Sequence, residues 1–302
     1  MTEGKRERGA LLTIGNFDGV HLGHRALISL MKSKAEADGV RTVAMTFHPH
    51  PVTVLTGREI PALQTLEERV ADLREAGIEE VSVYRFSAEL AAMTPREFVE
   101  RVLVEVFGVA GVVVGPDFRF GARRAGDAWT LAELGKEFGF SVDQVSIPLE
   151  VMGEVVSSTR LRRLLGAGDM RTYAAVRGGP YGITGTVVHG AGLGKGLGFP
   201  TANVVPPSEL LLPPAGVYAA LANLGDGERR VAAVSLGSRP TFDNGPTWLE
   251  AHILDFDGDI YGQTIRVDLH EMVRSELRFD SVEELKSVMR RDVEQIRNLQ
   301  LP

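Results

Sequence analysis

Apolar residues follow two different periods along the chain, and the change between them divides the sequence into two parts. In the first part, short apolar runs alternate with stretches in which apolar residues recur every three or four positions, as in amphipathic helices. The runs predict strands, and the stretches predict helices. This alternation predicts an α/β domain with a doubly wound parallel sheet, whose ligand crevice lies at the carboxyl ends of the strands. The strands are expected at 10–14, 42–47, 81–86, 112–115 and 142–147, and the helices around 27–31 and at 66–76, 96–107 and 129–138.

In the second part, strand patterns follow one another without helices between them. Two short helical segments, 161–165 and 170–176, precede this part and end at the stop signal Arg177-Gly178-Gly179-Pro180. We therefore place the domain boundary at Gly178, which gives domains of residues 1–178 and 179–302. Closely spaced strands predict a small antiparallel β-barrel with a terminal helix. The strands are expected at 183–189, 217–223, 230–236, 250–256 and 264–270, and the helix at 282–299.

Composition narrows the class of protein. The 302 residues suffice for two domains with separate cores, and 44% hydrophobic with 24% charged residues is typical of a globular protein. We expect no membrane association, because no apolar run reaches the roughly twenty residues that span a bilayer. A net charge of -7 argues against a nucleic-acid partner, and nothing indicates a protein partner. The absence of cysteine excludes thiol catalysis and agrees with a cytoplasmic location.

The strongest chemical signal is the segment GNFDGVHLGH at residues 15–24, which joins the first predicted strand to the first helix. Gly15 and Gly19 permit a sharp turn of the backbone. His21 and His24 are three residues apart, so they share one face of the first helical turn. Because a helix N-terminus favours an anion, the segment predicts a phosphate site with two imidazoles beside it.

Two other interpretations of these histidines stay open. Four histidines fall within the first fifty residues, and imidazoles at such spacing can hold zinc: His21, His24, His48 and His50. The pair in the signature can also serve only to cap the helix. The glycine turn before a helix N-terminus favours an anion over a cation, and so favours phosphate over zinc.

The same ten residues resemble the G-x-F-D-G-x-H-x-G-H signature of the bifunctional riboflavin kinase/FMN adenylyltransferases, the prokaryotic FAD synthetases. Further segments match this family in its order: FHPHP at 47–51, GPDFRFG at 115–121 and SSTRLR at 157–162. The resemblance implies that His21, His24 and Arg162 are catalytic. It also implies contacts to ATP phosphates by Gly15, Phe17, Asp18, Gly19, His48, Ser157, Ser158 and Thr159, and contacts to the flavin by Asp117 and Phe118.

Adenylyl transfer to FMN decides what this first site requires. The phosphate of FMN is already an anion, so its attack on the α-phosphorus of ATP needs no general base. It needs positive charge and orientation, which imidazoles, a helix dipole, an arginine fork and Mg²⁺ can supply. The absence of a catalytic carboxylate from the motif is therefore no objection.

A second nucleotide signal lies at residues 190–203, where glycines alternate through GAGLGKGLGFPTAN. Such a loop can be a flexible hairpin, or it can surround phosphates with backbone N–H groups. The segment does not match the Walker A motif, because Gly196 follows Lys195 where that motif needs Ser or Thr. The segment GFPTAN resembles the riboflavin kinase motif. The resemblance implies ATP contacts by Gly192, Gly194, Lys195 and Gly198, and Mg²⁺ binding by Thr201 and Asn203, whose oxygens suit a hard cation.

Phosphorylation of riboflavin benefits from a base, because its 5'-hydroxyl is neutral. Glu250 opens a segment, 250–262, that resembles the part of riboflavin kinases bearing the catalytic glutamate. Three aspartates follow, but Arg266 stands where an EF-hand has its closing glutamate, so a polar turn is favoured over calcium. Flavin-side positions are matched by Tyr218, Arg274 and Phe279, and by the segment Pro240-Thr241-Phe242.

Together these matches span about residues 11–280 and predict a bifunctional enzyme. Its C-terminal domain is expected to make FMN from riboflavin and ATP, and its N-terminal domain to adenylylate FMN to FAD and release pyrophosphate, both with Mg²⁺. Two alternatives stay open. One is a nucleotidyltransferase that acts on another phosphorylated acceptor, such as phosphopantetheine. The other is a catalytically silent flavin-binding regulator.

Overall fold

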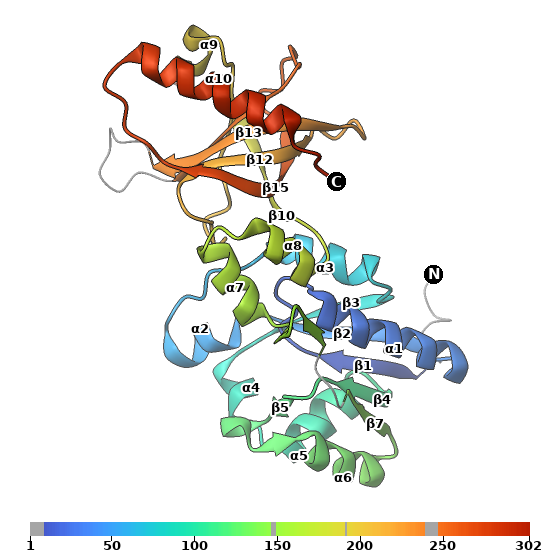
Figure 1. Ribbon diagram of the computed structural model, residues 1–302. Coiled ribbons are helices and arrows are strands. Elements are labelled where there is room, and N and C mark those ends of the chain that lie inside the picture. The colour runs from blue at the N-terminus through green and yellow to red at the C-terminus, as the bar shows by residue number, and fades with distance from the viewer. Residues whose placement is uncertain (1–8, 146–148, 191, 239–246) are drawn as a thin grey trace. The chain divides into compact units, whose positions relative to one another are not determined.

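The computed structural model describes residues 9–145, 149–190, 192–238 and 247–302, and the chain forms two compact units, Met1–Ser158 and Thr159–Pro302 (Figure 1). Helices α7 (Ser158–Gly166) and α8 (Met170–Arg177) lie between this division and the predicted boundary at Gly178. In the second unit, α8 packs on the barrel through Tyr173, whose ring meets Tyr181 edge-on at 5.5 Å. The functional boundary at Gly178 stays a prediction.

A five-stranded parallel sheet forms the centre of the first unit, in the order β3-β2-β1-β4-β7. This confirms the predicted doubly wound sheet. The chain builds outward from β1 to β3 and then returns to add β4 on the other side of β1. Such a reversal of strand order opens a crevice at the carboxyl ends of the central strands. The strands are β1 (Ala10–Ile14), β2 (Arg41–His48), β3 (Glu80–Arg85), β4 (Val109–Val114) and β7 (Ser141–Gln144).

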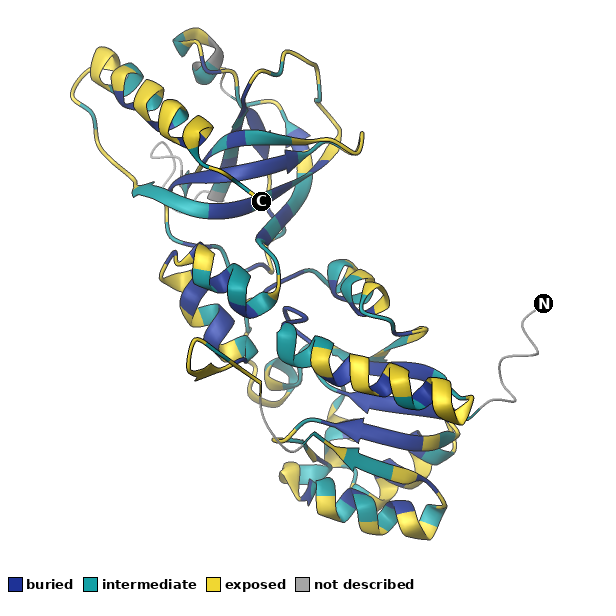
Figure 2. Ribbon diagram, turned by 45° about the vertical axis from the view of Figure 1, so that its right-hand side comes forward, coloured by how far each residue is buried: buried dark blue, intermediate teal, exposed yellow. Residues whose placement is uncertain are grey.

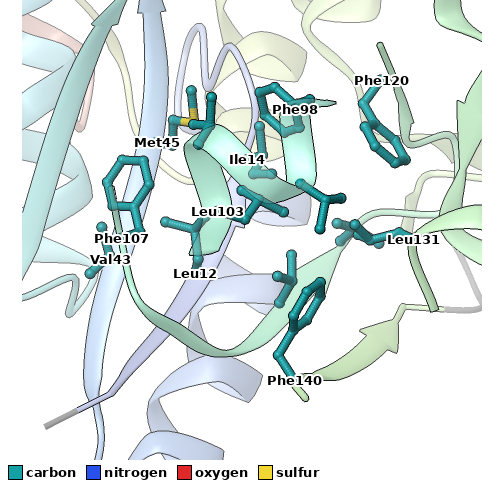
Figure 3. Packing of buried hydrophobic residues seen from close by; sticks show 14 of the residues in the cluster. Leu12, Ile14, Val43, Met45, Phe98, Leu103, Phe107, Phe120, Leu131 and Phe140 are labelled. Carbon is teal, nitrogen blue, oxygen red and sulfur yellow. The ribbon is translucent and has the colours of Figure 1, made fainter. Parts of the chain in front are cut away.

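Alternate residues of each strand point to opposite faces of the sheet, so the first unit has two apolar cores. Leu11 of β1 packs on one face, against α1 (Leu22–Asp38) and α3 (Leu66–Glu75). Leu12 packs on the other face, which Figure 3 shows from close by. Four short elements cover that face: α4 (Ala88–Ala92), α5 (Pro95–Phe98), the π-helical η2 (Val99–Val104) and α6 (Ala128–Phe138).

The sequence pattern missed several short elements of the first unit. The helix predicted at 96–107 is in fact α5 followed by the π-helical η2, whose end is marked by the bond from Glu105 N to Glu100 O. Leu30, one of the apolar residues in the helix predicted around 27–31, is exposed. Of the strand predicted at 142–147, residues 146 and 147 lie outside the described part of the chain. Unpredicted elements are α2 (Pro51–Thr56), α4, η3 (Ala122–Arg124) and the hairpins β5–β6 (Arg119–Phe120, Gly126–Asp127) and β8–β9 (Glu150–Val151, Glu154–Val155).

The second unit is a closed antiparallel barrel with the strand order β10-β11-β14-β13-β12-β15, which confirms the predicted barrel. Residues such as Tyr218 and Ala220 fill its interior, while Val217 and Ala219 face outward and pack with Ile296 of α10 (Val282–Asn298). Figure 2 shows buried strands and a helix α10 whose other face is exposed. The strands are β10 (Tyr181–Val188), β11 (Ala202–Val204), β12 (Gly216–Asn223), β13 (Arg229–Ser238), β14 (Thr247–Ile253) and β15 (Thr264–Ser275).

Two expectations for the barrel were wrong in detail. The strand predicted at 250–256 begins earlier and ends at Ile253, because Asp255 adopts a left-handed φ of 57° in a turn. The three-residue β11 was missed, since it is too short to show a period. In the parts of the chain that the structure describes, no helix is both long and apolar enough to cross a membrane.

Candidate active sites

The signature loop, which we define as residues 15–20, leaves the carboxyl end of β1 where the strand order reverses. Its backbone turns sharply, with left-handed φ at Phe17 (49°), Gly19 (86°) and Val20 (32°). Two interactions at Asp18 brace it from outside. Leu63 N donates to Asp18 Oδ1 at 3.0 Å, and Ser158 Oγ donates to Asp18 O at 2.7 Å. Asp18 and Ser158 thus shape the loop, and their predicted contacts with phosphate stay predictions.

His21 and His24 form a stacked pair at the start of α1. The side chain of His21 caps the helix, with Nδ1 accepting from His24 N at 3.3 Å. The two rings lie parallel within 13°, with centroids 3.7 Å apart, and the buried Phe17 ring meets His24 edge-on at 5.1 Å. A Cβ on Gly23 would lie 3.2 Å from His21 Nδ1, so a larger residue there would press on the His21 ring. His21 therefore caps the helix, as one interpretation predicted, and its ring also stacks on that of His24.

Both imidazoles are neutral at pH 7. Burial lowers the pKa of His21, which is 6% exposed, to about 4. Burial also lowers the pKa of His24 well below its usual value, and the charges of His21 and Arg69 lower it further. No described residue hydrogen-bonds His24 Nδ1, which is a buried atom although the residue as a whole is partly exposed. The pair therefore offers ring N–H groups to a phosphate, whose negative charge would in turn favour protonation.

The four histidines near the N-terminus do not form one cluster. His48 is exposed at the end of β2, and His50 caps α2 through Nδ1, which accepts from Val52 N at 3.2 Å. His50 Nε2 lies 3.2 Å from Asn16 Nδ2 of the signature loop, a contact that the sequence pattern did not indicate. Within the described residues no group of three or more His, Cys, Asp or Glu side chains is arranged to hold a metal, so the zinc interpretation finds no support there.

The other residues predicted for the first site lie outside the signature loop and the histidine pair. Phe118 follows β4 and stacks on Phe120, with centroids 5.5 Å apart, whereas Asp117 is exposed. Thr159 and Arg162 belong to the second unit. Their contacts with phosphate, like those of Ser157 and His48 and the flavin contacts of Asp117 and Phe118, stay predictions.

In the second unit, a pocket of about 310 Å³ lies between the barrel wall and α10. Its wall follows from strand register. In antiparallel sheets, directly paired residues point to the same side. One row therefore crosses five strands on the pocket side of the barrel: Asn203 pairs with Glu250, Glu250 with Ser235, Ser235 with Val217, and Val217 with Arg274. Ser235 is a pocket residue that sequence reasoning missed.

The glycine-rich segment is a short helix, α9 (Leu193–Leu197), rather than a flexible hairpin. Phe199 N donates to Gly194 O at 2.8 Å. A Cβ on Gly194 would overlap the Phe199 carbonyl oxygen and lie 3.1 Å from Thr201 Oγ1, so glycine lets the segment lie directly against Thr201. Gly192 and Gly198 have left-handed φ of 72° and 89°. For Lys195 only the backbone is described, and its phosphate contact stays a prediction, as do those of the three glycines.

His252 is a second pocket residue to which the sequence assigned no role. It lies two positions after Glu250 on β14, and so on the same side of the barrel. Its Nδ1 lies 2.8 Å from Pro200 O, and the Phe199 ring meets it edge-on at 5.5 Å. His252 therefore ties the segment that carries Thr201 to the strand that carries Glu250. The period-2 spacing from Glu250 was the signal in the sequence.

Arg274 connects the pocket wall to α10. Its Nε and Nη2 donate to Asp292 Oδ2 at 3.0 and 2.8 Å, and its guanidinium lies 5.9 Å from the Phe279 ring centroid. Tyr218 is placed differently: it is fully buried inside the barrel, its hydroxyl donates to Pro214 O, and burial raises its pKa to about 12. The predicted flavin contacts of these residues stay predictions, and Pro240-Thr241-Phe242 lie outside the described residues.

The residues of the barrel site suit Mg²⁺ chemically. Thr201 and Glu250 line the pocket, and the buried Asn203 pairs with Glu250 in the sheet register. Hydroxyl, amide and carboxylate oxygens are hard ligands, and Mg²⁺ commonly takes only one or two protein ligands together with substrate phosphates and water.

A phosphate-type site at the switch point of a parallel sheet, together with a glycine-bordered pocket containing a glutamate, defines a two-site, nucleotide-using transferase. Comparison with known families gives the finer answer. A family model described as FAD synthetase matches residues 3–160, and one described as riboflavin kinase matches residues 177–300. The chain belongs to the bifunctional riboflavin kinase/FMN adenylyltransferase family, which confirms the resemblance seen in its motifs.

Relatives of this kind match nearly the whole chain. The bifunctional riboflavin kinase/FMN adenylyltransferase of Escherichia coli (strain K12) is 40% identical over 95% of this chain and 91% of its own length. That of Pseudomonas fluorescens is 38% identical over 98% and 94%. A crystal structure described as a macrolide-efflux protein from Streptococcus pneumoniae is similar with a TM-score of 0.88 and 30% identity, covering 97% of this chain and 95% of that one.

Proposed function

We propose that this chain makes FMN from riboflavin and ATP in the barrel pocket, and converts FMN to FAD at the His21 and His24 site. The observation that carries the proposal is the register row, which puts Glu250 in one pocket with Thr201 and the glycine-rich segment. Such a pocket suits a kinase with a neutral alcohol as acceptor.

In the kinase step, Glu250 accepts the proton of the riboflavin 5'-hydroxyl as that oxygen attacks the γ-phosphorus of ATP. The bond from the γ-phosphorus to the bridging oxygen breaks, and ADP leaves. Thr201 and Asn203 would hold Mg²⁺, which when bound neutralises charge on the phosphates. His252 keeps the Thr201 segment beside Glu250 through Pro200, and the backbone N–H groups around Gly194 are available to phosphate oxygens.

In the adenylyl-transfer step, a phosphate oxygen of FMN attacks the α-phosphorus of ATP, and the bond to the β-phosphate oxygen breaks to release pyrophosphate. No proton has to be removed from the nucleophile. His21 and His24 donate hydrogen bonds to phosphate oxygens, and their stacked rings place the two imidazoles side by side at the start of α1. Arg162 is proposed as a further catalytic residue on the family resemblance alone, as a guanidinium suits phosphate.

The proposal extends to Mg²⁺ as the metal of both steps, to riboflavin, FMN, FAD and ATP as ligands, and to a cytoplasmic location without a nucleic-acid or membrane partner. The net charge of -7 and the lack of cysteine support the last part. A different phosphorylated acceptor is less well supported, because the kinase unit produces FMN for the first site. A silent regulator is less well supported because His21, His24, Thr201 and Glu250 are all present.

The test separates the two steps by single substitutions in the full chain. After incubation with ATP and Mg²⁺, chromatography of the flavins should show that Glu250→Ala abolishes FMN formation from riboflavin but still converts added FMN to FAD. His24→Ala should show the reverse. Glu209→Ala, which removes an exposed carboxylate from the second unit, should change neither activity. Unchanged FAD synthesis by His24→Ala would refute the role given to this residue.

A further inference from the structure

Arg69 is a buried charge in the first unit that none of the motifs includes. It lies on α3 and is 7% exposed. Its Nη1 donates to Phe47 O at 3.3 Å and to Thr46 Oγ1 at 3.5 Å, both at the carboxyl end of β2. Burying a guanidinium costs several kcal/mol of solvation, so its retention calls for a compensating role.

The contacts of Arg69 lead to the signature loop. Thr46 is fully buried and its hydroxyl donates to Asn16 O at 3.1 Å. Asn16 in turn contacts His50 through its side chain at 3.2 Å. One threonine hydroxyl therefore connects the guanidinium to the loop that leads into His21. Arg69, Thr46 and His50 together hold the loop from β2, α2 and α3.

The charge of Arg69 also acts on His24. The titratable groups that shift the pKa of His24 are His21 on its own helix and Arg69 on α3, and both lower it. The stacked His21 is itself neutral at pH 7, since burial lowers its pKa to about 4. Arg69 is therefore a permanent positive charge that acts on His24.

We propose that Arg69 is a positioning residue of the adenylyl-transfer site, which fixes the signature loop through Thr46 and supplies a permanent positive charge near His24. The inference rests on the proposed function of the first site. With this charge nearby, His24 stays a neutral hydrogen-bond donor until phosphate arrives, and the positive potential at the site does not depend on protonating either histidine. A fixed charge also avoids reorganisation when ATP binds.

Two substitutions in the full chain separate charge from packing. Arg69→Met keeps much of the volume and removes the charge, whereas Arg69→Lys keeps the charge and loses the fork. We expect Arg69→Met to lower kcat/KM for ATP in FAD formation about 10- to 100-fold, as for loss of one buried charge-assisted donor. It should also raise the pKa of His24, followed by NMR of labelled histidine. Arg69→Lys should stay within about fivefold of the unsubstituted protein and leave that pKa unchanged.

Two controls make the result specific. Arg74→Met changes an exposed arginine on the same helix and should leave both readouts unchanged. FMN formation from riboflavin by the same samples should be unaffected, because it takes place in the other unit. If the unsubstituted chain converts no FMN to FAD, the proposed function fails, while the His24 pKa still reports on Arg69.

The proposal is overturned if Arg69→Lys and Arg69→Met lose activity equally and the pKa of His24 does not move, because Arg69 then serves the fold alone. It is also overturned if Arg69→Met keeps full activity. If Arg69→Met does not fold, Arg69→Lys alone tests the proposal. FAD formation within about fivefold of that of the unsubstituted protein supports the proposal, and a loss of more than about tenfold contradicts it.

Discussion

The two sites of this chain are built on opposite principles. The first lies on a strained turn that leaves the middle of an open parallel sheet, and its two histidines come from one short stretch of sequence. The second lies on the outer wall of a closed barrel, and its groups come from five strands and a terminal helix. The histidine pair is specified locally, whereas the barrel site depends on register between distant segments.

The chemistry of the two steps differs in the same way. An anionic nucleophile needs charge and orientation, which we propose that the helix N-terminus and its two stacked imidazoles supply. A neutral hydroxyl also needs a proton acceptor at a fixed place, the role that we propose for Glu250 on the barrel wall. The difference teaches that neighbouring residues on one turn can bring two imidazoles together, whereas the barrel site gains its precision from strands held in register.

Of the substitutions that test this comparison of the two sites, we expect Gly194→Ala to have the largest effect on activity. The added Cβ overlaps the Phe199 carbonyl oxygen and pushes the segment away from Thr201. We expect riboflavin phosphorylation to fall roughly 100-fold or more, since small misplacements of reacting groups are costly, with FMN adenylylation unchanged. The matched control is Gly196→Ala, where a Cβ has no neighbour within 4 Å. Steady-state assays of both activities check it, and equal losses in the two variants would contradict it.

A smaller effect is expected at the helix that closes the barrel site. Asp292→Asn leaves the Arg274 guanidinium without its charged partner, so we expect about 2 kcal/mol of destabilisation and a higher KM for riboflavin. Asp255→Asn breaks a similar fork to Arg297 of the same helix, but that pair is exposed to solvent, so its loss should destabilise the fold much less. Urea unfolding and kinase assays measure both. Similar costs would show that burial of the pair is irrelevant.

Gly23→Ala should perturb the first site without destabilising the fold. A Cβ there presses on the His21 ring at 3.2 Å, so we expect FAD formation to fall about tenfold. Thermal stability should stay equal or rise, because alanine favours the helix by up to about 1 kcal/mol. Kinase activity should be unchanged. A variant that loses stability and activity together would show that the ring position is not what limits the reaction.

The smallest effect concerns pH. The pKa of His21 lies near 4 in the folded chain and near 6.5 in an unfolded one, so unfolding takes up a proton as the pH falls. His21 should therefore cost the first unit about 1 kcal/mol of stability between pH 7.5 and 6. His21→Asn keeps a capping oxygen and removes this dependence. Hydrogen exchange of β1 amides measures it, and an unchanged pH slope in the variant would exclude His21 as the cause.

The sequence predicted much of the fold because its main elements are periodic. The alternation of apolar runs and helices gave the parallel sheet, and the closely spaced strands gave the barrel. Elements of two to six residues, such as β11 and α2, were missed because they show no period. The strand at 250–256 was placed too far along, since a left-handed turn at Asp255 has no unambiguous local signal.

For the sites, the sequence by itself determined the loop that joins β1 to α1, the spacing of its histidines and the presence of a kinase-type glutamate. Those features are local, and local chain geometry is enough to specify them. Only the tertiary structure decided that the two rings stack in a buried place that keeps them neutral, that Arg69 acts on one of them, and that Ser235 and His252 join Glu250. Burial and strand register arise between segments far apart in the chain, and periodicity within one segment does not encode them.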